Sequence, residues 1–157
     1  MKSTTTLILA SKSPRRMEFL PRGGFYFLSV PAVKEEKITG GTSPSDAVLM
    51  LSRQKAEEIA EKYPYNTVIG ADTVVALGNE IMGKPENEQD AFNMLKKLSG
   101  KTHTVLTGVC VISPDKQINF YEKTEVEFYP LGDDEIRQVS LWTKRALTVS
   151  RKKALCL

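Results

Sequence analysis

The feature that most constrains this chain is the β-rich run from Thr67 to Leu77, Thr-Val-Ile-Gly-Ala-Asp-Thr-Val-Val-Ala-Leu. Its apolar and β-branched residues predict a strand that is buried on both faces. One carboxylate, that of Asp72, interrupts it. Because burial of an unpaired carboxylate is costly, Asp72 requires a partner, a metal or a function. Two interpretations are open: Asp72 lies at a bulge or strand end and caps neighbouring amides, or it acts as a base or metal ligand.

Helix and strand signals alternate on both sides of this run. Ser13-Pro14 and Ser43-Pro44 each place an N-cap residue before a proline, which predicts two helix starts. We expect the first helix to be short, interrupted by Pro21 and the Gly23-Gly24 pair, and the second to end near Tyr63. Further strands are expected at 7–10, 25–33, 103–113 and 118–129, the last two forming an antiparallel hairpin, with a third helix at 86–98. These elements predict a single domain built on a mixed α/β sheet.

The composition argues against several classes of protein. The 157 residues are of single-domain size, and 22 basic against 19 acidic residues give a net charge of +3, too small for a nucleic-acid coat or a membrane surface. No apolar run approaches the roughly 20 residues of a membrane-spanning helix, and the N-terminal segment predicts a buried strand rather than a signal peptide. Cys110 and Cys156 show neither metal-ligand spacing nor a disulfide framework, so we expect a reducing, cytoplasmic location.

The segment from Leu7 to Arg16 has the composition of a phosphate site. Ser11, Ser13 and the Arg15-Arg16 pair surround a helix N-terminus, where the dipole, free amides and guanidiniums bind phosphate together. The alternative is a capped surface helix with solvated arginines. The spacing by itself leaves both interpretations open.

Other charged residues are weaker signals when they are taken singly. Each of them is explained equally well as a charge exposed to solvent. They are Lys55 within the second helix, Glu35-Glu36 before it and Lys84 in the stiff Gly-Lys-Pro loop. His103, the sole histidine, we assign to structure rather than chemistry. Neither a Ser/His/Asp set nor a nucleotide-binding glycine motif occurs in the sequence. The remaining inventory of carboxylates and cations suits phosphate-ester chemistry with Mg²⁺ or Mn²⁺.

Four strings, in this order and at these separations, resemble the Maf family: Leu-Ile-Leu-Ala-Ser-Lys-Ser-Pro-Arg-Arg (7–16), Gly-Ala-Asp-Thr-Val-Val (70–75), Gly-Lys-Pro (83–85) and Leu-Ser-Gly-Lys-Thr-His-Thr-Val (98–105). The resemblance extends from about Leu7 to about Gln138. It implies a Maf-like (ITPase-like) α/β fold, with an elongated, twisted mixed sheet, flanking helices and a cleft between two lobes. It also implies a homodimer.

The same resemblance implies a hydrolase of acid anhydrides that cuts a nucleoside triphosphate to its monophosphate and pyrophosphate. A Ser-Pro-Arg-Arg loop without an inserted tryptophan resembles the dTTP/UTP branch, and the implied cofactor is a divalent cation, Mg²⁺ or Mn²⁺. The roles implied for individual residues are phosphate binding by Ser11, Arg15 and Arg16, positive charge from Lys55 and Lys84, specificity at Arg15 and Thr73, metal and water binding by Glu36 and Asp72, and proton acceptance by Asp72. The alternative is a nucleotide-binding protein without turnover that arrests septum formation through a cell-division partner.

The chain departs from the family pattern after about Gln138. The family continues there with a block resembling Glu-Pro-Met-Asp-Lys-Ala-Gly-Ala-Tyr-Gly-Ile-Gln, which this chain lacks. Shifting one permitted back-translation of Val139 to Cys156 by a single base restores that block. We therefore interpret 139–157 as an out-of-frame tail, which leaves the C-terminal part of the fold incomplete and predicts uncovered apolar surface and open strand edges. An inactive, poorly folded product is a third interpretation.

Overall fold

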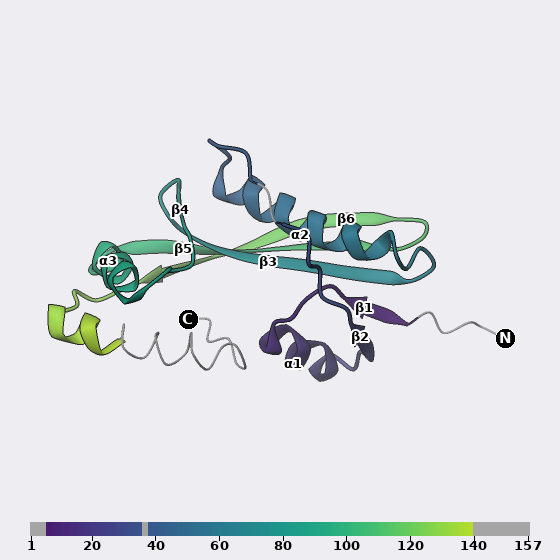
Figure 1. Cartoon of the computed structure of the whole chain (residues 1–157), viewed down its shortest axis with the longest axis horizontal. Helices are drawn as coiled ribbons and strands as arrows, with labels where there is room; N and C mark the ends of the chain where they lie inside the picture. Colours follow the sequence, from purple (N-terminus) through teal and green to yellow (C-terminus); the bar gives the residue numbers. More distant parts are fainter. Residues whose placement is uncertain (1–5, 36–37, 140–157) are drawn as a thin grey trace. The chain divides into compact units, whose positions relative to one another are not determined.

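The computed structural model describes residues 6–35 and 38–139, and within them strands and helices alternate as the sequence predicts (Figure 1). This arrangement confirms the predicted α/β class. The predicted out-of-frame tail lies outside the described residues except for Val139. The elements are β1 (Leu7–Leu9), α1 (Pro14–Arg22), β2 (Phe27–Ser29), α2 (Pro44–Ala60), β3 (Thr67–Leu77), β4 (Glu80–Met82), α3 (Glu88–Leu98), β5 (Thr102–Ile112) and β6 (Gln117–Glu127), and residues 133–139 are also helical.

The strands form one mixed sheet in the order β2-β1-β3-β5-β6, with β4 paired to β3. β1 is parallel to both of its neighbours, whereas β3 and β4 are antiparallel and joined at Gly78, whose φ is +60°. β1 pairs with β3 only as far as Ile69, so β3 continues past the carboxyl end of β1. This leaves an edge of β3 beside the loop that follows β1.

The residues divide into two compact units. Among the described residues, the first unit consists of 6–35, 38–73 and 106–123, and the second of 74–105 and 124–139. The first unit therefore contains β1, α1, β2 and α2, and the second contains β4 and α3. Each of the three long strands, β3, β5 and β6, contributes residues to both units.

Helix α2 packs directly on the sheet of the first unit, because glycines in two strands face it. A Cβ atom at Gly70 would lie 2.3 Å from the carbonyl oxygen of Ser52, and one at Gly108 would lie 2.3 Å from that of Val48. Contacts this short exclude a side chain at either strand position. The buried residues Ile8, Ala10, Ile59 and Val68 form a core cluster between this helix and the sheet.

Two local predictions differ from the structure. Pro21 was expected to interrupt the first helix, but it lies in the last turn of α1, where a missing N–H removes only one hydrogen bond; the helix ends before Gly23-Gly24, as predicted. The strand expected at 25–33 is only Phe27–Ser29. It is shorter because the amide of Val30 makes the last bond to β1, and Pro31 has no amide hydrogen to continue the ladder.

Candidate functional site

The loop between β1 and α1 is organised around the Ser11 side chain, which is 6% exposed. Its Oγ accepts a hydrogen bond from the amide of Ser13 at 3.1 Å and one from Arg16 Nη1 at 3.3 Å. Ser13 is the N-cap residue of α1, as predicted, but its side chain makes no capping bond to the helix. The hydroxyl of Ser29 on β2 donates to the carbonyl of Ser11 at 3.0 Å. The loop is therefore fixed on both sides.

Arg16 links this loop to the part of β3 that extends past β1. Its Nη1 donates to the carbonyl oxygen of Ala71 at 2.9 Å, and its Nη2 donates to Thr73 Oγ1 at 3.1 Å. Thr73 Oγ1 also shares a 3.0 Å hydrogen bond with Thr107 Oγ1 on β5. A guanidinium has five N–H donors, so two remain beyond the bonds to Ser11, Ala71 and Thr73. Arg16 thus contacts the residues on both sides of Asp72.

Asp72 forms an ion pair with Lys55 of α2. Their side chains are 13% and 17% exposed, so the pair is largely shielded from solvent. Asp72 lies inside strand β3 rather than at its end. Because Gly70 and Asp72 share a face of β3, the close approach of α2 at Gly70 also brings Lys55 to Asp72.

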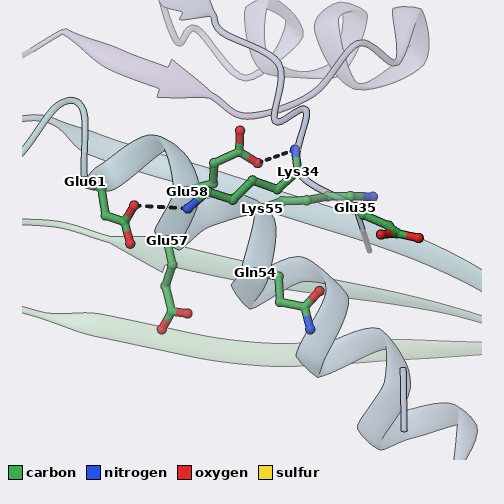
Figure 2. Close-up of a pocket in the computed structure, with 7 residues that line it drawn as sticks. All are labelled: Lys34, Glu35, Gln54, Lys55, Glu57, Glu58 and Glu61. Atoms are coloured by element: carbon green, nitrogen blue, oxygen red, sulfur yellow. Dashed lines mark hydrogen bonds and ion pairs between the residues drawn. The ribbon is translucent and has the colours of Figure 1, made fainter. Parts of the chain in front are cut away.

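A pocket opens between α2 and the segment that follows β2 (Figure 2). It lies entirely within the first unit. Lys55, the partner of Asp72, contributes to its wall. The lining residues are Lys34, Glu35, Gln54, Lys55, Glu57, Glu58 and Glu61.

Glu58 of α2 holds one wall of this pocket, although its side chain is almost fully buried. Both carboxylate oxygens accept hydrogen bonds from the amide of Val33, at 3.0 and 3.1 Å, and one also accepts the amide of Lys34 at 3.0 Å. Burial by itself raises the pKa of this carboxyl. The two amides and the positive charge of Lys62 outweigh that effect, so the pKa lies below its ordinary value.

Five of the predicted site residues take part in the described contacts. Ser11, Arg16 and Thr73 form one cluster, and Lys55 and Asp72 form another. Strand β3 joins the two clusters, because Asp72 and Thr73 are adjacent in it and point to opposite faces of the sheet.

None of the contacts described above involves Arg15 or Lys84. Arg15 is exposed on α1 of the first unit, whereas Lys84 is exposed after β4 in the second unit. Glu36 lies outside the described residues.

Sequence reasoning missed Glu58 and Thr107. Glu58 occupies a position among the buried residues of α2, between Ala56 and Ile59, and an acidic residue in such a place signals a bound partner. Thr107 lies in a β-rich run, and nothing in the sequence distinguishes it from a threonine with an ordinary role in a strand.

The donor set suits a hard divalent cation only in combination with a substrate. Asp72 and Glu35 supply carboxylate oxygens, which Mg²⁺ and Mn²⁺ prefer. Among the described residues, no group of three or more His, Cys, Asp or Glu side chains is placed to hold a metal. Mg²⁺ is commonly bound through one or two carboxylates plus substrate phosphates, and these residues fit that mode of binding.

Comparison with known proteins supports the fold and the family. Within the described residues, no helix combines the length and apolar character needed to cross a membrane. The chain is similar in fold, at 14% identity and a TM-score of 0.59, to the Ham1 protein of Staphylococcus aureus, over 94% of this chain and 100% of that one. This likeness supports the expected ITPase-like fold.

Curated relatives are much closer in sequence. The chain is 50% identical over 130 residues to a dTTP/UTP pyrophosphatase of Bacillus cereus, which covers 83% of this chain and 64% of that protein. It is 49% identical over 130 residues to a dTTP/UTP pyrophosphatase of Bacillus mycoides, covering 83% and 68%. The chain therefore spans about two thirds of the length of these relatives. Residues 6–146 match the family described as Maf-like protein, and the chain belongs to that family.

Proposed function

We propose that this chain carries the catalytic residues of a nucleoside triphosphate pyrophosphatase acting on dTTP and UTP. The observation that carries the proposal is the Lys55–Asp72 ion pair next to the cluster of Ser11, Arg16 and Thr73. The names and roughly 50% identity of the curated relatives support the same substrate class. They favour an enzyme over the alternative of a division inhibitor without turnover.

In this proposal the phosphates bind at the carboxyl end of β1. Ser11, the two remaining donors of Arg16, and Arg15 provide hydrogen bonds and positive charge there. Lys84 adds a cation, and Arg15 with Thr73 discriminates the base. Because Arg16 is already held by β3, it binds phosphate without first losing side-chain freedom.

Asp72 accepts a proton from the attacking water. The water oxygen forms a bond to the α-phosphorus, the bond from that phosphorus to the bridging oxygen breaks, and pyrophosphate leaves with the bonding electron pair. Lys55 holds the Asp72 carboxylate in place and neutralises charge that develops on the phosphate oxygens. A bound Mg²⁺ or Mn²⁺, held by Glu36 and Asp72, would lower the pKa of the water and offset phosphate charge. The proposal includes a cytoplasmic homodimer.

The test is pyrophosphate release from dTTP and UTP with Mg²⁺ or Mn²⁺. Asp72→Asn is expected to reduce the rate by about 10²- to 10⁴-fold, since it removes the proton acceptor while keeping the shape of the side chain. Asp115→Asn, in the exposed turn between β5 and β6, is the matched control and should retain full activity. Release of inorganic phosphate without pyrophosphate would exclude the proposed bond cleavage. The same assay is made on a second chain with the family block restored after Val139. Pyrophosphate release only by the restored chain would mean that the site of this chain is incomplete, and release by neither chain would mean that the proposed function is wrong.

A further inference from the structure

Glu58 is an unusual acidic residue, because the described structure uses its buried carboxylate mainly to bind backbone amides. Its side chain is 2% exposed. Lys62, its cationic neighbour, lies 3.7 Å away and is 55% exposed, which makes that pair a weak electrostatic contact. The bonds from Val33 and Lys34 are shorter, at 3.0 to 3.1 Å, and come from two consecutive amides. Hydrogen bonds to an ionised acceptor are about twice as strong as neutral ones.

The two amides come directly before a pair of acidic residues in the sequence, Glu35 and Glu36, which we call the acidic segment. Glu35 follows Lys34 directly and lines the same pocket as Lys55 (Figure 2). Glu36 is the next residue in the sequence. Glu58 and Lys55 are three residues apart on α2, so they project from the same side of the helix. One rigid helix therefore carries both the residue that holds the acidic segment and the residue that pairs with Asp72.

A second contact ties the same segment to α2 from the solvent side. Lys34 Nζ lies 3.2 Å from the carboxylate of Glu61, and both side chains are more than 60% exposed. Such a pair contributes little by itself. The buried bonds of Glu58 therefore determine where Val33 and Lys34 lie.

We propose that Glu58 is a positioning residue, which fixes residues 33–35 on α2 and so sets where the chain leads into Glu36, the residue that the proposed function assigns to the divalent cation. The inference rests on the proposed function for its role in turnover. Its structural part, the anchoring of residues 33–35 by α2, is independent of turnover. Glu58 acts through the segment and touches neither substrate nor cation.

The structural part is tested by amide hydrogen exchange in the full chain. In the unsubstituted protein, the amides of Val33 and Lys34 are expected to be protected from exchange although both residues are exposed. Glu58→Gln keeps one acceptor oxygen and should speed their exchange about tenfold, whereas Glu58→Asp should have an intermediate effect. Lys62→Met leaves the carboxylate in place and should change neither rate. Unprotected amides in the unsubstituted chain, or equal protection in Glu58→Gln, would overturn the proposal.

The functional part is tested with Mn²⁺ and dTTP. Glu58→Gln should raise the Mn²⁺ concentration for half-maximal pyrophosphate release about tenfold and leave the KM for dTTP within twofold, with partial rescue at high Mn²⁺. A merely structural role would lower the amount of active protein and leave the Mn²⁺ dependence unchanged, which would overturn the proposal.

A binding measurement separates failure of the proposed function from failure of this inference. If the unsubstituted chain releases no pyrophosphate, the proposed function fails for this chain. Electron paramagnetic resonance of Mn²⁺ with dTTP then decides the inference without turnover. Weaker Mn²⁺ binding in Glu58→Gln than in Lys62→Met supports it, and equal binding of Mn²⁺ in the two variants overturns it.

Discussion

Glu58 in the first unit and His103 in the second are both ionisable and both buried, at 3% and 5% exposure, yet their surroundings differ. Glu58 receives hydrogen bonds from two backbone amides. In the part of the chain that the structure describes, His103 Nδ1 has no hydrogen-bond partner, and its ring packs edge-on against Phe128 at a centroid distance of 4.7 Å. Burial lowers the pKa of His103, whereas the amides keep Glu58 charged. A buried charge is kept where the backbone binds it, and otherwise the neutral form is favoured.

The largest expected effect is on the packing of α2, the helix that carries Glu58, against β3. Gly70→Ala should destabilise the protein by about 3 kcal/mol, because the added methyl group would lie 2.3 Å from the carbonyl of Ser52 and push α2 off the sheet. The measurement is the midpoint of denaturant unfolding. Gly40→Ala, where no heavy atom lies within 4 Å of the new Cβ, is the control and should change stability by less than about 0.5 kcal/mol. Equal midpoint shifts in the two variants would contradict the close packing.

The next effect compares the two buried groups directly. Glu58→Leu should cost about 2 kcal/mol of unfolding free energy, because it removes bonds from two amides to a charged acceptor. His103→Leu should change stability by less than about 1 kcal/mol, since the unbonded Nδ1 loses no partner and its burial cost disappears. Chemical denaturation of both variants at pH 7 measures the difference. A larger loss in His103→Leu would reverse the comparison.

A smaller effect is the pH dependence that His103 contributes. Its pKa in the folded protein lies below the ordinary 6.5, so between these two values the unfolded chain binds more protons. Stability from this residue is therefore complete above about pH 6.5 and falls as the pH decreases toward the folded pKa. Melting curves from pH 7.5 to 5 should show this slope, and His103→Phe should remove it. Loss of stability from Glu58 begins only as the pH falls through the ordinary carboxyl pKa, and it continues down to the lowered folded pKa.

The smallest effect belongs to an exposed ion pair of the second unit. Lys97 Nζ lies 2.5 Å from a carboxylate oxygen of Glu80, but the side chains are 43% and 55% exposed. Lys97→Ala is expected to cost less than about 1 kcal/mol, and 1 M salt should reduce the difference further. Thermal unfolding of both proteins at low and high salt measures it. If Lys97→Ala lowered the free energy of unfolding as much as Glu58→Leu, the exposed ion pair and the buried hydrogen bonds would contribute equally, which contradicts the comparison.

Local signals in the sequence account for much of the fold. The bounds of β3 were predicted to the residue, since its composition is almost entirely β-forming. The start of α2 follows from its Ser43 cap, whose Oγ accepts the amide of Asp46 at 3.2 Å. The strand expected at 25–33 was too long, because strand length depends on a partner, and β1 offers only three residues for pairing.

The sequence by itself determined the fold class, most of the elements, the family, and the chemical types of residue from which a phosphate site is built. Only the tertiary structure decided which of these residues meet. Arg16 bonds to Ala71 and Thr73, which lie 55 and 57 positions further along the chain. Lys55 reaches Asp72 because Gly70 lets α2 approach β3. The physical reason is that propensity and capping act between near neighbours in the chain, whereas ion pairs and buried hydrogen bonds depend on distances that packing sets. Glu58 lies between apolar positions of its helix, which signals a bound partner, but only the fold shows that the partners are the amides of Val33 and Lys34.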